Sequence, residues 1–340
     1  SRLAFIRAFF ARELQEIIPA AQEGLEIAQR HDNQPAIAFA HFAIGFCHHF
    51  LQDHAAAIPH YEESLQRFRE LGDRYYTART LHRLGDCYAP EIGTARSMEM
   101  TREALELALE IDAFFDACVA LKNLGILSTL VGNFAKGEQL EREGVNLALE
   151  LGFPHVMANT SVHLGLARFL SGDVDQATQL VRRGLALGAD LDVQKIVADG
   201  QAVLALLDVA AGNYEQALRL ALQSEGRTSI PDGVILPDWA LAMVYAGLDQ
   251  LQKARRHLCQ AFDAALFYGW PGAMTWLLPV AVVLLAKAGQ RERAVEVAAL
   301  SSSQELSRQG WKERWELYGQ VNDELARELD PALYQAARVR

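Results

Sequence analysis

The chain has 340 residues, of which 51% are hydrophobic and 22% charged. This composition excludes an intrinsically disordered protein and is typical of a folded one. The formal net charge of −11 and the lack of a Lys and Arg cluster exclude a nucleic-acid backbone as the main partner. The longest apolar stretch, 276–286, contains Pro279 and is shorter than the ~20 residues that a membrane-spanning helix needs, so no membrane association is expected.

From the N-terminus onward, the chain shows a repeat of forty residues. Gly45, Gly85, Gly125 and Gly165 are forty residues apart, and Ile or Leu precedes each of them. A second series, made mostly of small residues, follows the glycines at a distance of twelve positions. Its members are Ala57, Ser97, Gly137 and Ala177, and Ala217, Ala254 and Ala294 continue it. A fixed period of this size is typical of a solenoid, in which each unit buries its apolar face against its neighbours. We therefore expect a functional surface and no catalytic pocket.

Each repeat is predicted to form a helical hairpin. The first helix carries the glycine and the second carries the small residue, with short polar turns between them such as SGDVDQA at 171–177. In such a turn, Gly supplies a left-handed helix stop and the following Asp or Asn supplies the N-cap of the next helix. Apolar residues recur at helical spacing, as in Leu81, Leu84 and Tyr88, without the alternation of a strand. The expected fold class is all-α.

The pattern predicts eight hairpins followed by a tail. The hairpins are expected around 3–30, 34–72, 74–112, 114–152, 154–190, 194–224, 236–269 and 273–303. An irregular loop is expected at 225–237, because Pro231, Gly233 and Pro237 interrupt a helix. The tail, 304–340, is expected to form C-terminal capping helices with a break at Asp330 and Pro331, since the open end of a solenoid needs a cover.

The repeats resemble the tetratricopeptide repeat (TPR), whose pattern is a large residue, then Leu-Gly, then an aromatic residue, then A-x3-F. The string TLHRLGDCY at 80–88 carries Leu81, Leu84, Gly85 and Tyr88 of that pattern, and Ala57 with Tyr61 fits its second helix. The resemblance covers about residues 3–303. It implies an α-solenoid, a right-handed superhelix of about eight TPR-like helical hairpins with a capping helix.

The period of forty, longer than the thirty-four of an ordinary TPR, resembles the long repeats of bacterial signal-transduction ATPases with numerous domains (STAND). The last segment, DELARELDPALYQAARVR at 323–340, also resembles the tail that follows such repeats, and the chain is expected to end inside that motif. In that family the superhelix binds an inducer and releases a nucleotide-binding module of the same protein. The resemblance thus implies a non-enzymatic sensor domain whose partners are that module and an inducer peptide, protein or small molecule.

No catalytic, metal or cofactor motif is found. The string GNFAKGEQ at 132–139 lacks the ending of a phosphate-binding loop. His41, Cys47, His48, His49 and His54 are close in sequence, but their spacing does not converge on one helix face, so we predict structural or surface histidines, no metal and no cofactor. The four cysteines are scattered, which favours a reducing compartment, the cytoplasm, and no disulfide.

The TPR resemblance also implies which residues line the concave groove, because first helices face it. Carried over by position, the lining is aromatic near one end, basic and amide-rich in the middle, and indole-bearing at the other end. We predict an anionic or aromatic ligand for it. The predicted ligand-binding residues are Phe42, Phe46, His49, Arg79, His82, Arg83, Asp86, Lys122, Asn123, Asn159, His163, Trp239 and Trp276, with Phe39 beside them.

Three functions remain open at this point. The first is the STAND sensor domain, and the second is a constitutive TPR scaffold that holds a protein partner without switching. The third, an all-α hydrolase, would need a cluster of acids in one concavity, and Asp86 alone does not supply it. A clamp for the acidic C-terminus of chaperones is disfavoured, since only Asn123 matches its pattern and Asp86 would repel an acidic tail.

Overall fold

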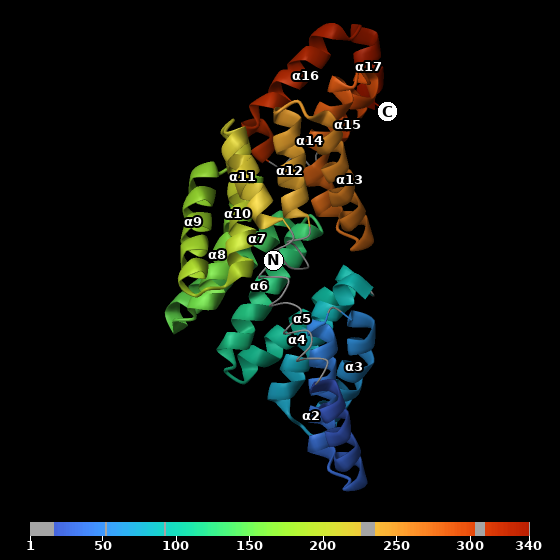
Figure 1. Cartoon of the computed structure of the whole chain (residues 1–340), viewed down its shortest axis with the longest axis vertical. Coiled ribbons are helices and arrows are strands. Elements are labelled where there is room, and N and C mark those ends of the chain that lie inside the picture. Colours follow the sequence, from blue (N-terminus) through green and yellow to red (C-terminus); the bar gives the residue numbers. More distant parts are fainter. Residues whose placement is uncertain (1–16, 52, 92, 226–234, 303–309, 340) are drawn as a thin grey trace. The chain divides into compact units, whose positions relative to one another are not determined.

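The computed structural model describes residues 17–51, 53–91, 93–225, 235–302 and 310–339, nearly all of which are helical (Figure 1). No strand occurs within these ranges, and residues 17–30 form their first helix. In the described part of the chain, no helix combines the length and the apolar character needed to cross a membrane. The chain divides into two compact units, Ser1–Leu124 and Gly125–Arg340.

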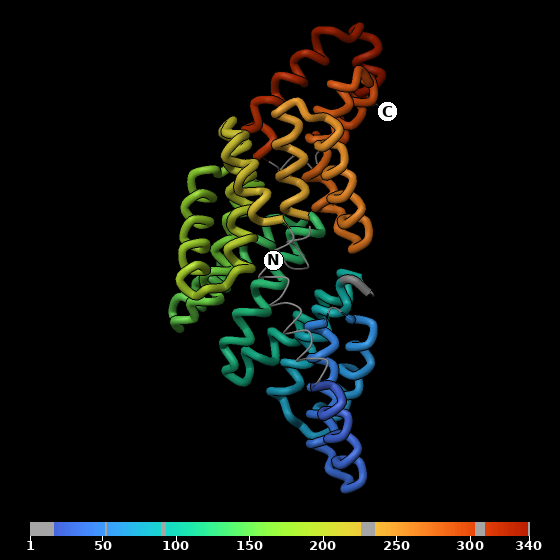
Figure 2. The backbone as a smooth tube through the Cα atoms, in the orientation of Figure 1, coloured from blue at the N-terminus to red at the C-terminus, as the bar shows by residue number. Residues whose placement is uncertain are grey.

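Successive helices of each unit pair as hairpins, which the backbone trace in Figure 2 shows. In the first unit they are α2 (Gln34–Phe50), α3 (His54–Glu70), α4 (Arg74–Glu91) and α5 (Thr94–Glu110), and α6 (Phe114–Leu130) runs into the second unit. The second unit continues with α7 (Phe134–Leu151), α8 (Pro154–Ser171), α9 (Val174–Asp190), α10 (Gln194–Ala210), α11 (Tyr214–Ser224), α12 (Leu236–Gly247), α13 (Leu251–Phe267), α14 (Pro271–Lys287) and α15 (Arg291–Ser301). The predicted all-α fold of TPR-like helical hairpins is confirmed.

The turn between α8 and α9 has the predicted construction. Gly172 follows the last residue of α8 with a φ of 89°, in the left-handed region that glycine adopts without strain. The next residue, Asp173, is the N-cap of α9, and its side chain accepts a hydrogen bond from the backbone N–H of Gln176 at 3.1 Å. Together the two residues end one helix and begin the next within a single short turn.

The glycine repeat marks the line of closest approach within a hairpin. Each of the four glycines faces the residue sixteen positions later, on the second helix: Tyr61, Thr101, Glu141 and Val181. A Cβ atom added to Gly85, for example, would lie 2.8 Å from Oγ1 of Thr101, nearer than Cβ atoms approach other atoms in folded proteins. The expected reason for the small residues, close packing of the two helices, is therefore confirmed.

The expected loop at 225–237 is only partly described, because residues 226–234 lie outside the described ranges. α12 begins at Leu236, where the hairpin of 236–269 was expected to start, and it includes Pro237 in its first turn. A proline fits there because the first turn of a helix has no partner for its N–H groups.

The tail forms η2 (Gly310–Arg314), α16 (Glu316–Glu328) and α17 (Pro331–Val339). The expected break between the last two helices is present, and the Asp330 carboxylate accepts a hydrogen bond from the backbone N–H of Ala332 at 2.9 Å. α16 packs on α14 and α17 packs on α15. Residues 304–309 of the expected capping region, and residue 303 at the end of the last expected hairpin, lie outside the described ranges.

The core of the second unit is built around indole rings. Trp239 of α12 has ring centroids of Phe169, Trp276 and Trp311 within 6.0 Å of its own. Trp311 belongs to η2, so the short tail helix inserts a large side chain between elements that precede it by many residues. Burying several aromatic side chains at one place contributes a large share of the stability of such a unit.

The four cysteines form no disulfide, and all four lie within the described ranges. Cys47, Cys87 and Cys118 are buried, whereas Cys259 on α13 is exposed. Burial raises the pKa of the Cys118 thiol to about 11 and also raises that of Cys47. Both thiols therefore stay protonated and unreactive near neutral pH.

We expect one thiol in four to react with an excess of a disulfide reagent such as dithionitrobenzoate on the folded protein, because Cys259 alone is exposed. Addition of a denaturant should bring the count to four. Cys259→Ser should abolish the fast reaction, whereas Cys118→Ser should leave it unchanged. A fast reaction of two or more thiols in the native state would contradict this assignment of exposure.

Candidate functional site

Nine of the predicted ligand-binding residues lie in the first unit, on the first helices of three successive hairpins. These nine are Phe42, Phe46 and His49 of α2, Arg79, His82, Arg83 and Asp86 of α4, and Lys122 and Asn123 of α6. Contacts between neighbouring helices link α2 with α4 and α4 with α6, as the following distances show. The structure therefore brings this part of the predicted site together.

An aromatic stripe runs along α2. Phe39, Phe42, Phe46 and Phe50 are three or four residues apart, which places their side chains on one face of the helix. Centroids of successive rings are 6.3, 6.5 and 4.4 Å apart. Phe42 is buried and packs edge-on against Tyr61, whereas Phe39 and Phe50 are each 48% exposed. Phe42 thus supports the stripe from below, and the other rings offer apolar area to solvent.

Two arginines of α4 lie over aromatic rings. The guanidinium carbon of Arg83 is 5.8 Å from the ring centroid of Phe46 and 5.9 Å from that of Phe50. Arg79 lies 5.6 Å from the ring centroid of Tyr75, one helical turn earlier. Such cation–π contacts hold a guanidinium in place while leaving its N–H groups directed outward. We call Phe46, Phe50, Tyr75, Arg79 and Arg83 the aromatic–arginine surface.

Asp86 connects this surface to α6. Its carboxylate accepts a hydrogen bond from Nδ2 of Asn123 at 2.9 Å and lies 3.4 Å from Nη1 of Arg83. Burial acts to raise the pKa of Asp86, but His82 and Arg83 lower it more, so the pKa lies below its usual value. Burial also lowers the pKa of His82 to about 4. At neutral pH the carboxylate is therefore ionised and the imidazole neutral.

The remaining four predicted residues lie in the second unit and are buried, which does not fit the open groove lining that the TPR resemblance implies. The exposed fractions are 5% for Asn159, 3% for His163, 0% for Trp239 and 2% for Trp276. The prediction assumed that every first helix has one open face. α8 instead is buried around most of its circumference, and the indole of Trp239 packs against Trp276 and against Trp311 of η2. These side chains are core residues.

Several residues of the site were missed from the sequence. Phe50 and Tyr75 supply the exposed rings below the two guanidinium groups, and Asp116 lies 3.8 Å from Nε of Arg79. The signal for Phe50 and Tyr75 was present, because each stands four residues from a predicted residue on the same helix. Asp116 could be placed only by the packing of α6 on α4.

A second cationic surface occurs in the second unit. Arg142, Arg168 and Arg183 line a hollow of about 610 Å³ between α7, α8 and α9, together with Gln176. Glu138 forms ion pairs with two of these arginines, Arg142 and Arg168, and neutralises part of their charge. No aromatic ring lines this hollow, and its apolar lining consists of Leu164 and Leu180.

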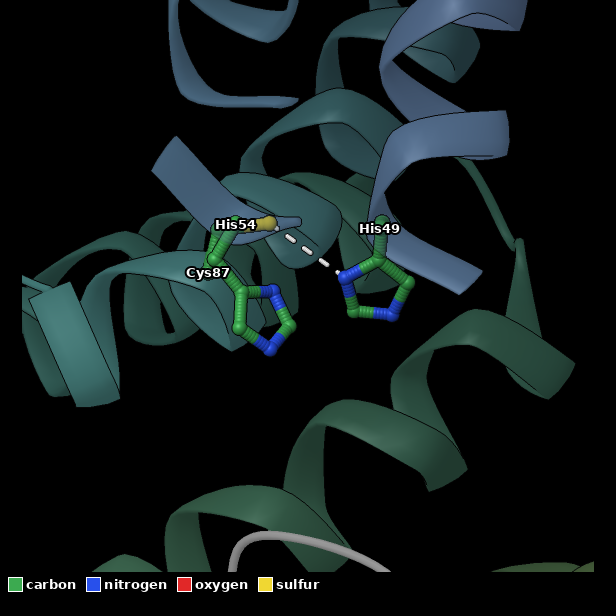
Figure 3. A group of neighbouring side chains, drawn as sticks. All are labelled: His49, His54 and Cys87. Atoms are coloured by element: carbon green, nitrogen blue, oxygen red, sulfur yellow. Dashed lines mark hydrogen bonds between the residues drawn. The ribbon is translucent and has the colours of Figure 1, made fainter. Parts of the chain in front are cut away.

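One group of side chains in the described ranges has the composition and proximity of a metal site. It consists of His49 at the end of α2, His54 at the start of α3 and Cys87 of α4, and Figure 3 shows the three together. The spacing within residues 41–54 could not reveal it, because the third side chain comes from the next hairpin. Burial lowers the pKa of His49 to about 4, which leaves its imidazole neutral.

Comparison with known proteins supports the repeat assignment. Residues 36–110 match the family model of the tetratricopeptide repeat. The chain is 28% identical over 109 residues to the 43 kDa receptor-associated protein of the synapse from Tetronarce californica, a match that covers 32% of this chain and 26% of that protein. The chain thus spans about a quarter of the length of that relative.

Two solved structures share the fold. The crystal structure of a Rap protein complexed with competence and sporulation factor aligns with 95% of this chain and 88% of its own, with a TM-score of 0.54 and 14% identity. A STAND protein with a tetratricopeptide repeat sensor from Pyrococcus horikoshii aligns with 77% of this chain and 44% of its own, with a TM-score of 0.52 and 14% identity. At this identity the similarity concerns the helical-repeat fold.

Proposed function

We propose that this chain is the sensor domain of a multidomain STAND ATPase and binds an anionic peptide inducer on the aromatic–arginine surface. The observation that carries the proposal is the position of Arg79 and Arg83, each held over an exposed or half-buried aromatic ring. Positive charge and apolar area thus lie side by side on adjacent helices. A peptide with a carboxylate next to an apolar side chain would use both.

The guanidinium groups retain donors for such a ligand. Nη1 of Arg79 donates one hydrogen bond to the Tyr75 hydroxyl at 3.2 Å, its Nε lies 3.8 Å from Asp116, beyond hydrogen-bond distance, and Arg83 makes one long contact of 3.4 Å with Asp86. Each guanidinium carries five N–H donors and suits the planar geometry of a carboxylate. The rings below would take the apolar side chain of the peptide, as aromatic residues do in protein interfaces.

The similarity to a STAND sensor and to a Rap protein in complex with competence and sporulation factor supports a ligand-binding role for this fold. In the proposed mechanism the ligand binds one arrangement of the hairpins more tightly than another and shifts the population toward it. The partner that responds is a nucleotide-binding module of the same full-length protein, in the cytoplasm. The domain itself has no catalytic role in this proposal.

A constitutive scaffold is the second candidate. The sequence similarity to a receptor-associated protein of the synapse favours it. The two candidates differ in their response to ligand, because only a sensor must change conformation. Small-angle scattering and thermal melting with a library of acidic peptides should reveal a ligand that compacts the domain and raises its melting temperature. A tight peptide or protein complex without any change in scattering of the domain would favour the scaffold.

Lys122 of α6 lies near Asp86, beside the aromatic–arginine surface, and its charge acts with that of Arg83 to lower the pKa of Asp86. We expect Arg79→Ala and Lys122→Ala each to weaken binding of an acidic peptide about tenfold or more, since a charge-assisted hydrogen bond contributes about 1.5–3 kcal/mol. Fluorescence anisotropy of labelled peptides that contain Glu and Phe would measure the change, and circular dichroism should show an intact fold. Arg96→Ala is the matched control, because Arg96 is exposed on α5 and pairs with Glu99.

The hollow lined by Arg142, Arg168 and Arg183 in the second unit is the alternative binding site for an anionic peptide. Arg183→Ala should leave the affinity unchanged if the peptide binds the aromatic–arginine surface. An affinity that falls with Arg183→Ala, and not with Arg79→Ala, would place the anionic ligand in the other hollow. Unchanged affinity in Arg79→Ala and Lys122→Ala would overturn the proposed binding surface.

A further inference from the structure

Three helices bring two imidazoles and a thiol to one place in the first unit. Nδ1 of His49 lies 3.3 Å from Sγ of Cys87, and the ring centroids of His49 and His54 are 5.3 Å apart. One ligand atom from each of the three side chains lies within 4.8 Å of the other two. His54 and Cys87 are buried, whereas His49 is partly buried.

We propose that His49, His54 and Cys87 bind a Zn²⁺ ion. Zinc binds imidazole nitrogen at about 2.0–2.1 Å and thiolate sulfur at about 2.3 Å, and tetrahedral bond angles then separate the two ligand atoms by about 3.6 Å. The distance of 3.3 Å between His49 and Cys87 is within a few tenths of an ångström of this value. The remaining separations are at most 4.8 Å, so they need to shorten by no more than about 1.4 Å, which side-chain rotations supply.

The donor set selects the kind of ion. Two nitrogens and one sulfur suit Zn²⁺ and similar transition metals, whereas Ca²⁺ and Mg²⁺ prefer oxygen ligands. The Cys87 thiolate supplies one negative charge, which offsets part of the charge of the ion. Three protein ligands leave the fourth position to water, as in zinc sites that remain open on one side.

The ion would connect α2, α3 and α4, which belong to two successive hairpins of the first unit. Because it binds the folded arrangement of these helices, it stabilises that arrangement in proportion to the logarithm of the free metal concentration. This inference does not rest on the proposed peptide-binding function. The metal can be measured without any peptide, so failure of one proposal leaves the other intact.

Titration with Co²⁺ as a spectroscopic substitute for Zn²⁺ tests the site. The full 340-residue chain without an affinity tag should carry Cys259→Ser, which removes the exposed thiol. We expect one Co²⁺ per chain, with a thiolate-to-cobalt charge-transfer band in the near ultraviolet and the visible bands of tetrahedral cobalt. Zn²⁺ should displace the cobalt and abolish both spectra, and added Zn²⁺ should raise the melting temperature.

Three variants localise the ion. Cys87→Ser should abolish the charge-transfer band, and His49→Gln should weaken Co²⁺ binding by at least about tenfold, the smallest loss usual for a side chain that only supports a metal ligand. Cys118→Ser, which replaces another buried thiol of the same unit, should retain the full spectrum. If Cys87→Ser does not fold, His49→Gln decides, because its side chain is only partly buried.

The absence of a charge-transfer band at millimolar Co²⁺ would overturn the proposal. So would a cobalt spectrum that is unchanged in His49→Gln and Cys87→Ser, since the metal would then lie elsewhere on the chain. A melting temperature that Zn²⁺ raises equally in the parent protein and in both variants would have the same meaning.

Discussion

Replacing Trp239 by alanine is expected to lower the free energy of unfolding of the second unit by about 3–5 kcal/mol, the usual cost of removing a fully buried aromatic side chain. The indole has no exposed surface and packs against Phe169, Trp276 and Trp311. Its removal leaves a cavity that these rigid rings cannot fill. The loss should be measured by urea denaturation followed by circular dichroism.

The control for this substitution is Phe267→Ala, which removes an aromatic ring that is 70% exposed on the surface of the same unit. Its effect should stay within about 0.5 kcal/mol, as for most surface substitutions. Trp239→Phe should fall between the two, because it keeps an aromatic ring and leaves a smaller cavity. A loss below about 1 kcal/mol in Trp239→Ala would contradict the close packing of the indole cluster.

The cluster of Trp239, Trp276 and Trp311 also shows what the sequence could not predict. The repeat pattern placed Trp239 and Trp276 on first helices, and the TPR resemblance turned that position into a prediction of exposure. The structure differs because η2 of the tail packs on α8 and α12, where Trp311 contacts Phe169 and Trp239. A contact between segments far apart in the chain has no periodic signal, so neither composition nor spacing could predict it.

The group of His49, His54 and Cys87 was missed for a related physical reason. Spacing along one helix shows which side chains share a face, but His49 ends α2 and His54 begins α3, so it gave no sign that their ring centroids are 5.3 Å apart. Cys87 completes the cluster from α4, the first helix of the next hairpin. In a repeat protein, candidate ligands should therefore be sought across neighbouring helices and repeats as well as within one helix.

The glycine series predicted the structure best, because each glycine marks a local contact between the two helices of a hairpin. Two helices that approach closely exclude a Cβ atom at their contact, whatever surrounds the hairpin. Ala177 and Ala217 of the second series are likewise fully buried. The aromatic–arginine surface was predictable in part for the same reason, since Arg79 and Arg83 lie one turn apart on a helix whose register the glycines define.

Among the four glycines of the series, Gly165 has the closest contact with the second helix of its hairpin, so a larger residue there should lower stability strongly. Gly165→Leu is expected to destabilise the second unit by about 3 kcal/mol or more, because overpacking a close contact costs at least 1–3 kcal/mol. A Cβ at Gly165 would lie well inside 3.0 Å of Cγ2 of Val181 and 3.2 Å from the carbonyl oxygen of Ala177. The backbone of α9 cannot yield without separating the hairpin. Thermal melting and urea denaturation should both show the loss.

Gly319→Leu is the matched control, since Gly319 lies in the helix α16 and a Cβ there would meet no atom within 4 Å. Leucine favours a helix over glycine by nearly 1 kcal/mol, so the control should be neutral or slightly stabilising.

Truncation of the residue that faces Gly165, Val181, separates the effect of packing from that of helix propensity. Gly165→Ala combined with Val181→Ala should cost less than the sum of the single substitutions, because the shortened side chain makes room for the new methyl group. Equal losses at Gly165 and Gly319 would instead mean that the forty-residue spacing of glycines does not mark the contact between paired helices.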